Sequence, residues 1–183
     1  MKRHSLVIEE FACWGCRACE TACKQEHNPV QAAHPVQYLT VWGDGPRMMN
    51  GRLDFLWRVN VCRHCDDPAC VKACGEEAIT KREDGIVVLD QEKCTGCRSC
   101  VDACPYQAVH FDDEVQSAVK CNLCHHRVDQ GLYPACADNV CLAHCIYFGD
   151  PDEIEKEVLA KRRVRGGWGE ILPPRTPSER REP

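Results

Sequence analysis

The sequence has no long hydrophobic run and no leader pattern. No uninterrupted apolar stretch approaches the roughly 18 residues that a membrane-spanning helix needs, so we expect no direct membrane insertion. The opening residues MKRHSLVIEEF reach two glutamates after a very short apolar stretch, unlike a secretory signal, and Lys2-Arg3 is not a twin-arginine pair. These absences predict a soluble, cytoplasmic protein.

Other functional classes lack their signatures too. The formal net charge of -5 at pH 7 argues against a nucleic-acid partner, because such a surface needs a basic surplus. The chain has no glycine-rich phosphate loop and no persuasive Ser-His-Asp or paired-carboxylate motif. We therefore expect it not to be an enzyme on its own.

Cysteine, in contrast, is abundant. It supplies 17 of the 183 residues, a density that in a short chain indicates disulfides or bound metal. A reducing cytoplasm disfavours disulfides, and an odd count leaves at least one thiol unpaired. Bound metal is therefore the better explanation.

Sixteen of the cysteines form four blocks, and Cys145 is left over. Block one is CWGCRACETAC (13–23), block two is CRHCDDPACVKAC (62–74), block three is CTGCRSCVDAC (94–104), and block four joins CNLC (121–124) to CADNVC (136–141).

The spacing within a block suits iron-sulfur clusters. Three thiolates in a C-x2-C-x2-C turn surround one face of a cubane cluster, and the chain then becomes helical and carries the fourth thiolate to a second cluster, as in two-cluster ferredoxins. Two blocks must therefore exchange their last cysteines. Block three is the most specific, because Gly96 permits the tight turn and Pro105 completes the bacterial ferredoxin pattern.

Zinc is the alternative for each C-x2-C pair. Structural zinc sites usually come as two separated pairs rather than as three thiols in one turn, so blocks one and three favour a cluster. Block two fits less closely, since it has an extra residue before its third cysteine, with Pro68 in the added turn, and Gly75 where the pattern has proline.

Two similar segments follow blocks two and three. In AITKREDGIVVLD, two β-rich runs flank Asp84-Gly85, which favours a two-residue hairpin turn, and AVHFDDEVQSAVK again has two runs about a polar turn. This repeat pairs blocks two and three, and by subtraction blocks one and four. The predicted fold is α+β, with two interleaved bacterial ferredoxin-like (2[4Fe-4S]) modules, short hairpins and a C-terminal helix.

The predicted iron-sulfur domain spans residues 1–149, with an inner module at about 60–115 and an outer module from about 5–35 plus 116–149. Strands are expected at 37–42 and 53–61, where Trp42 and Trp57 suit packing or a partner surface. An irregular connection between these strands is marked by Gly43, Gly45, Pro46 and Gly51.

The remaining part, 150–183, is expected to be a helix and a tail. Asp150 can cap the helix, Pro151 suits its first position, and the basic run 161–163 suits its last turn. Gly166-Gly167 should end it. The proline-rich tail beyond is either disordered or extended along a partner, to which Ile171 and Leu172 would bind.

The four blocks in this order resemble the iron-sulfur electron-transfer subunits of the dimethyl sulfoxide reductase type, including small subunits of formate dehydrogenases, hydrogenases and tungsten oxidoreductases. The likeness rests on CWGCRACETACK, CRHCDDPACVKAC, CTGCRSCVDACP, and CNLCHHRVDQGLYPAC with CIYFGDPDE, which cover most of residues 6–153. The resemblance implies four [4Fe-4S] clusters and, as partner, a larger catalytic subunit that is a molybdenum or tungsten pterin enzyme.

The resemblance also implies four ligand sets, the first of which lies nearest the catalytic partner in this family. The sets are Cys13, Cys16, Cys19 and Cys141; Cys23, Cys121, Cys124 and Cys136; Cys62, Cys65, Cys70 and Cys104; and Cys74, Cys94, Cys97 and Cys100.

Block four departs from the family pattern. Four residues rather than three separate Cys136 from Cys141, and Leu142 stands where the family has proline. Cys145 is either an alternative ligand or a buried free thiol, and a zinc ion or an altered cluster at a block-four site stays open. Four histidines beside cysteines should hydrogen-bond cluster sulfurs or face solvent: His64, His125, His126 and His144.

The predicted function is an electron relay that passes single electrons through the clusters between the catalytic subunit and a further redox partner, such as another electron-transfer subunit. The tungsten aldehyde oxidoreductase type, including reductases of aromatic acyl-CoA thioesters, is a specific candidate. A free soluble polyferredoxin and a zinc-binding structural module are the alternatives.

Overall fold

The computed structural model describes residues 3–28, 38–49 and 51–164. The described chain combines short helices with short strands, the α+β composition expected from the sequence. In chain order the elements are β1 (Ser5–Ile8), the short helix η1 (Glu10–Ala12), α1 (Ala18–His27), β2 (Leu39–Met49), β3 (Arg52–Val61), α2 (Ala69–Lys72), β4 (Ile79–Lys81), β5 (Val87–Leu89), α3 (Ser99–Ala103), β6 (Val109–Asp112), β7 (Ser117–Lys120), α4 (His125–Val128), β8 (Ile146–Gly149) and α5 (Pro151–Val164).

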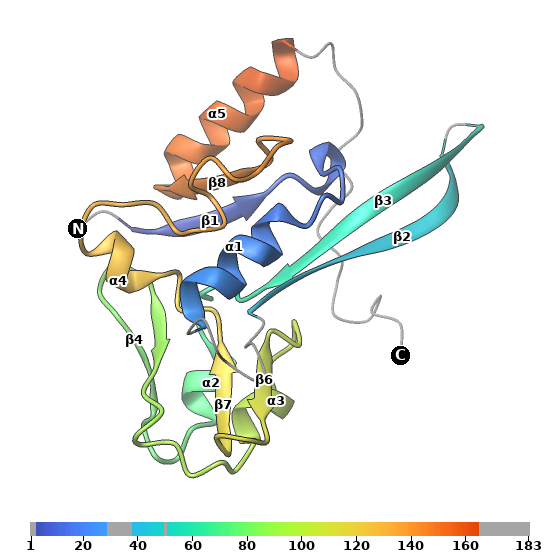
Figure 1. Ribbon diagram of the computed structural model, residues 1–183. Coiled ribbons are helices and arrows are strands. Elements are labelled where there is room, and N and C mark those ends of the chain that lie inside the picture. Colours follow the sequence, from blue (N-terminus) through green and yellow to red (C-terminus); the bar gives the residue numbers. More distant parts are fainter. Residues whose placement is uncertain (1–2, 29–37, 50, 165–183) are drawn as a thin grey trace.

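The strands of the described residues pair as four two-stranded antiparallel sheets, β1 with β8, β2 with β3, β4 with β5, and β6 with β7. The β1–β8 pair joins the two ends of the described chain, with Ser5 opposite Gly149 and Ile8 opposite Ile146. Figure 1 shows that β4, β6, β7, α2 and α3 lie on one side of the molecule, while β1, β8, α1 and α5 lie on the other. The two ends of the described chain therefore lie together on one side of the molecule, and the middle of the sequence lies on the other (Figure 1).

The two short hairpins after blocks two and three are confirmed. Ile79 lies opposite Leu89 in the first hairpin and Val109 opposite Lys120 in the second. The expected two-residue turn at Asp84-Gly85 is wrong, because the Arg82 N–H donates to the Ile86 carbonyl and leaves three residues between them. Gly85 adopts φ +91° at the end of this longer turn, where a left-handed backbone is needed.

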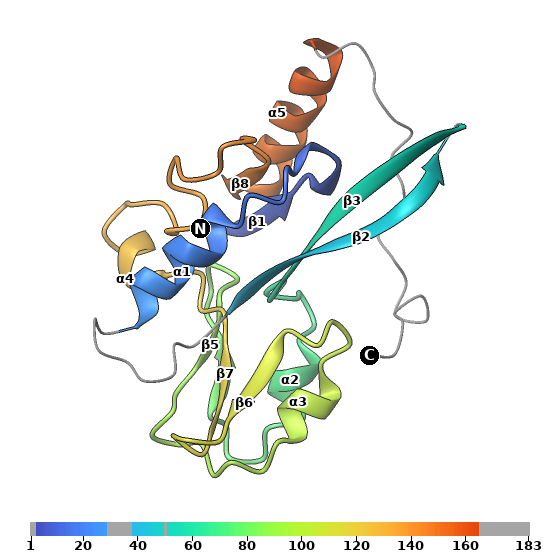
Figure 2. The same ribbon diagram turned by 45° about the vertical axis from the view of Figure 1, so that its right-hand side comes forward.

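The long β2–β3 hairpin differs from the expectation. The predicted break at Gly43, Gly45 and Pro46 is wrong, because β2 continues through these residues to Met49 and the pairing shifts register only between Asp44 and Arg47. The register shift takes up Gly45 and Pro46 as a bulge, so the ladder resumes beyond them. The hairpin projects from the rest of the molecule in both views (Figures 1 and 2).

Ion pairs attach the base of this hairpin to η1. The Arg58 guanidinium lies 2.6 Å from Glu10 Oε2 and 3.0 Å from Asp44 Oδ2, and the Val59 N–H donates to Glu10 Oε1 at 3.0 Å. The expected strand at 37–42 begins at Leu39, and its residue 37 lies outside the described residues. Trp57 is half-buried, whereas Trp42 is exposed, so only Trp57 serves as a packing residue.

The C-terminal helix begins as expected. Asp150 accepts the Asp152 N–H at 3.0 Å through its side chain, and Pro151 is the first helical residue of α5. Ile154 is buried and so attaches the helix to the core. The expected stop at Gly166-Gly167 and the tail with Ile171 and Leu172 lie outside the described residues.

Candidate metal centres

Every cysteine block has the same backbone turn. The residue just before the second cysteine is left-handed in all four blocks: Gly15 (φ +68°), His64 (φ +46°), Gly96 (φ +74°) and Leu123 (φ +55°). This conformation aims backbone N–H groups at the first sulfur, as in the Gly15 N–H to Cys13 Sγ contact of 3.4 Å and the Leu123 N–H to Cys121 Sγ contact of 3.3 Å. Such N–H donors suit a thiolate bound to iron.

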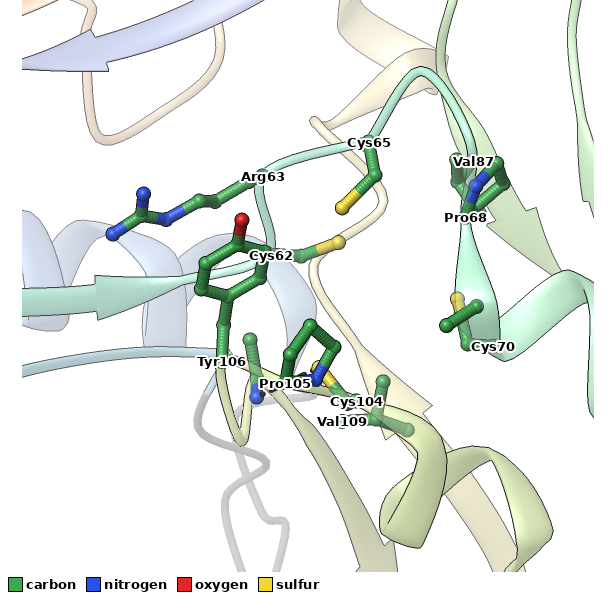
Figure 3. A pocket seen from close by; sticks show the side chains of 12 residues that line it. Cys62, Arg63, Cys65, Pro68, Cys70, Val87, Cys104, Pro105, Tyr106 and Val109 are labelled. Atoms are coloured by element: carbon green, nitrogen blue, oxygen red, sulfur yellow. Dashed lines mark hydrogen bonds between the residues drawn. The ribbon is translucent and has the colours of Figure 1, made fainter. Parts of the chain in front are cut away.

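We number the sites in the order of the four predicted ligand sets. The cysteines of the third set come together in what we call the third site. Cys62, Cys65, Cys70 and Cys104 line one cavity, together with Pro105 and Tyr106. Figure 3 shows these four cysteines arranged around a shared space. Cys104 of block three thus lies beside the first three cysteines of block two, as the predicted exchange requires.

The complementary exchange forms the fourth site. Cys74 from block two lies with Cys94, Cys97 and Cys100 around a second cavity. Cys97 is exposed, and a hydrogen bond from Ser99 lowers its pKa. One edge of this site therefore faces solvent.

The first site contains five thiols rather than four. Cys13, Cys16, Cys19, Cys141 and Cys145 line a third cavity. Cys16 is exposed, whereas Cys145 is 2% exposed and its Sγ lies 3.5 Å from Cys141 Sγ. The leftover cysteine is therefore a buried thiol beside the predicted ligands.

The second site is the most deeply buried. Cys23, Cys121, Cys124 and Cys136 are all buried, and each of the first three acts electrostatically on Cys136. Desolvation raises the pKa of Cys136 well above its ordinary value and that of Cys23 to about 11. Arg127 and His126 of the α4 segment contact Glu26 of α1 at 3.0 and 2.7 Å, which fixes block four against block one.

Helices connect neighbouring sites. Cys19 and Cys23 lie on α1, which therefore contributes one thiol to the first site and one to the second. In the α2 segment, Cys70 belongs to the third site and Cys74 to the fourth. In the α3 segment, Cys100 belongs to the fourth site and Cys104 to the third. Four residues of helix rise about 6 Å, so the two cysteines of such a pair lie about one helical turn apart along the backbone.

Two histidines lie close to the sites, and of these the sequence analysis had singled out only His64. His27 Nε2 lies 3.3 Å from Cys124 Sγ, a contact that no local motif predicts. His64 is buried and accepts the Val87 N–H at Nδ1, and desolvation lowers its pKa to about 3, so the neutral ring carries its proton on Nε2. Among the described residues that Nε2 has no hydrogen-bond partner, which leaves a donor suited to a cluster sulfur.

The three histidines beside block-four cysteines and Cys145 behave differently from one another. His126 binds Glu26 at 2.7 Å, His125 lies 3.8 Å from Asp129, and His144 is exposed. For His144 the expectation of a solvent-facing side chain is confirmed.

The donor chemistry fits iron-sulfur clusters. Each site offers soft thiols, which in the first, third and fourth sites line a cavity. Among the described residues no three His, Cys, Asp or Glu side chains converge closely enough to bind a single ion. Burial raises the pKa of Cys19 to about 12 and that of Cys70 to about 11, so these thiols are protonated when free and release protons when they bind metal.

Comparison with known proteins agrees with this geometry. A family model described as a 4Fe-4S dicluster domain matches residues 53–151, and one described as a 4Fe-4S binding domain matches residues 10–28. A tetrathionate reductase subunit of Archaeoglobus fulgidus is 38% identical over 88% of this chain and 74% of its own length. The chain belongs to the iron-sulfur subunits of the dimethyl sulfoxide reductase type.

Two further relatives are also single chains of reductases and support the same family assignment. One chain of the anaerobic dimethyl sulfoxide reductase of Escherichia coli is 35% identical over 85% of this chain and 77% of its own length. One chain of the polysulfide reductase of Wolinella succinogenes is 34% identical over 90% of this chain and 87% of its own. The iron-sulfur subunit is thus an electron-transfer subunit of an oxidoreductase complex and binds several [4Fe-4S] clusters, as the sequence predicted.

Within the described ranges, the iron-sulfur subunit has no helix both long enough and apolar enough to cross a bilayer. The cytoplasmic location stays a prediction.

Proposed function

We propose that the iron-sulfur subunit holds four [4Fe-4S] clusters, one in each of the four sites, and relays single electrons through them without a reaction of its own. The proposed ligands are the four sets named above, with Cys141 rather than Cys145 completing the first. Cys145 interacts with Cys13, whereas Cys141 acts electrostatically on both Cys13 and Cys19, and this favours Cys141 as the ligand. When bound, the clusters supply the electron acceptors, and the protein supplies their order, burial and hydrogen bonds.

The observation that carries this proposal is the continuous order of the sites. Helix α1 connects the first site to the second, Cys62 of the third acts electrostatically on Cys121 of the second, and α2 and α3 connect the third to the fourth. This order supports an inner module at about 60–115 inside an outer module made of about 5–35 and 116–149. Residues 150–183 would then be an appended helix and tail.

The two exposed ligands mark the ends of the route. Of the 17 cysteines only Cys16, in the first site, and Cys97, in the fourth, are exposed. An electron entering at one end would leave at the other after crossing two shielded sites. Trp14, 67% exposed beside Cys16, adds apolar surface to the first end, where the family resemblance puts the catalytic partner.

We further propose that this partner is a larger molybdenum or tungsten pterin enzyme and that the complex is cytoplasmic. The tungsten aldehyde oxidoreductase type, including aromatic acyl-CoA reductases, is the specific candidate. A second redox protein or subunit would dock at the Cys97 end. The relatives are named as single subunits or chains of reductases, which favours such a complex over a free polyferredoxin.

Anaerobic purification of the native complex tests the proposal. We expect about 16 iron atoms per chain, four for each cluster, and a co-purifying subunit that contains a pterin cofactor. Iron and zinc are measured together, because zinc at a block-four site would reduce the iron content by about four atoms. A partner without any redox cofactor, or a chain that purifies alone as a monomer, would refute the relay-subunit proposal.

A further inference from the structure

Lys120 is a buried cation between two of the sites. It is the last residue of β7, directly before Cys121, and it is 3% exposed. Its Nζ donates to the Val87 carbonyl of β5 and, at 2.7 Å, to the Cys121 carbonyl. Within the part of the chain that the structure describes, no carboxylate forms an ion pair with it.

A buried ammonium group needs an opposite charge. Two carbonyls accept two of its three N–H bonds but do not neutralise it, and burying an unneutralised charge is costly. Elsewhere in the molecule carboxylates neutralise such a charge, as where Arg58 lies between Glu10 and Asp44. Lys120 therefore requires a different source of negative charge.

The neighbouring metal sites supply it. Lys120 directly precedes Cys121 of the second site, and its Nζ donates to the carbonyl of Val87, a residue that lines the cavity of the third site. From this position it acts electrostatically on both Cys70 and Cys121. A [4Fe-4S] cluster bound by four thiolates has a net negative charge, and one-electron reduction makes that charge larger without making or breaking a bond. A nearby cation thus attracts the reduced form more strongly than the oxidised form.

We propose that Lys120 is the counter-ion shared by the clusters of the second and third sites, and that it raises the reduction potentials of both. The inference rests on the proposed four-cluster assignment. Because Lys120 is shielded from water, salt screens its effect little. Because Lys120 raises both potentials together, the two central clusters can accept an electron from a cluster at either end.

Lys81 provides a matched control. It also lies beside block two, with Nζ donating to the Cys65 carbonyl at 3.0 Å and the Asp66 carbonyl at 2.9 Å. Unlike Lys120, its side chain is 26% exposed and lies 3.5 Å from the Asp66 carboxylate. Its charge is therefore already balanced and partly screened.

The test is a redox titration of the anaerobically purified complex, followed by electron paramagnetic resonance. The variants are Lys120→Met, Lys120→Gln and Lys81→Met. We expect both Lys120 variants to lower the potentials of two clusters together and to leave the other two near their wild-type values. Lys81→Met should cause a clearly smaller shift, and only this smaller shift should fade as the ionic strength is raised.

Lys120→Gln separates charge from hydrogen bonding, because its amide can still donate to a carbonyl. Wild-type potentials in Lys120→Gln would overturn the proposal and assign Lys120 a purely hydrogen-bonding role. Equal shifts in Lys120→Met and Lys81→Met, or equal shifts of all clusters, would also overturn it. So would loss of iron from both Lys120 variants before titration, since Lys120 would then retain clusters rather than tune them.

Iron analysis of the wild-type complex distinguishes failure of the counter-ion proposal from failure of the four-cluster assignment. About 16 iron atoms per chain with no shift in the Lys120 variants refutes the counter-ion alone. A wild-type chain with far less iron refutes the four-cluster assignment, whatever the variants do.

Discussion

Gly96→Ala offers a quantitative test of the cysteine turns, with Gly51→Ala as its matched control. Both glycines are left-handed, with φ of +74° and +76°. An alanine in this conformation costs about 1–2 kcal/mol at either position. At Gly96 the new Cβ would also lie 2.7 Å from the Gln116 carbonyl oxygen, whereas at Gly51 nothing lies within 4 Å.

The close contact at Gly96 is with backbone, so the β6–β7 turn or the block-three turn must move. Such overpacking costs about 1–3 kcal/mol, which brings the expected loss for Gly96→Ala to about 2–5 kcal/mol. A protein of this size loses roughly 2–4 °C in melting temperature for each kcal/mol. We therefore expect roughly 4–20 °C for Gly96→Ala and roughly 2–8 °C for Gly51→Ala.

The assay is thermal unfolding of the anaerobic, cluster-loaded protein at one fixed scan rate, with iron release followed in parallel, because unfolding that destroys clusters is irreversible. Gly96→Ala should release iron earlier than Gly51→Ala, since its turn carries three of the proposed cluster ligands. Equal losses of melting temperature in the two variants would refute the reasoning from the Gln116 contact.

Four further predictions concern the sites. Cys97→Ser should remove one cluster and about four iron atoms per chain, measured by iron analysis, while the other clusters keep their signals; unchanged iron would contradict the fourth ligand set. Cys145→Ala should keep wild-type iron but lower the potential of the first cluster, because it removes the thiol that lies 3.5 Å from Cys141 Sγ; loss of a cluster would instead make Cys145 a ligand. His27→Phe should lower the potential of the second cluster by removing a donor 3.3 Å from Cys124, and a potential equal to wild type would argue against that bond. Trp14→Ala should weaken co-purification of the catalytic subunit more than Leu159→Ala does, although both side chains are exposed, and equal weakening would argue against docking beside Cys16.

The sequence predicted what is local. Cysteine spacing, the Asp84-Gly85 turn region and the Asp150-Pro151 cap are each set by neighbouring residues, so the blocks, the two short hairpins and α5 were found. The exchange of cysteines between blocks came from a repeat together with a family resemblance. It could not come from spacing alone, because spacing does not say which blocks meet.

Contacts between distant segments were missed. Nothing around His27 indicates that Cys124 will be its neighbour, 97 residues away. Glu20 is likewise buried and accepts the Val41 N–H, although a glutamate on a helix usually faces water. His64 and Leu123 adopt left-handed conformations that propensity disfavours, and only the shared turn of all four blocks explains them.

The uneven exposure of the cysteines also bears on damage by oxygen. Oxidants attack thiolates that they can reach, and in this chain they can reach Cys16 and Cys97 far more readily than the rest. Decay in air should therefore begin at the clusters proposed for the first and fourth sites and cut the subunit off from both proposed partners while the iron of the two inner sites is still intact.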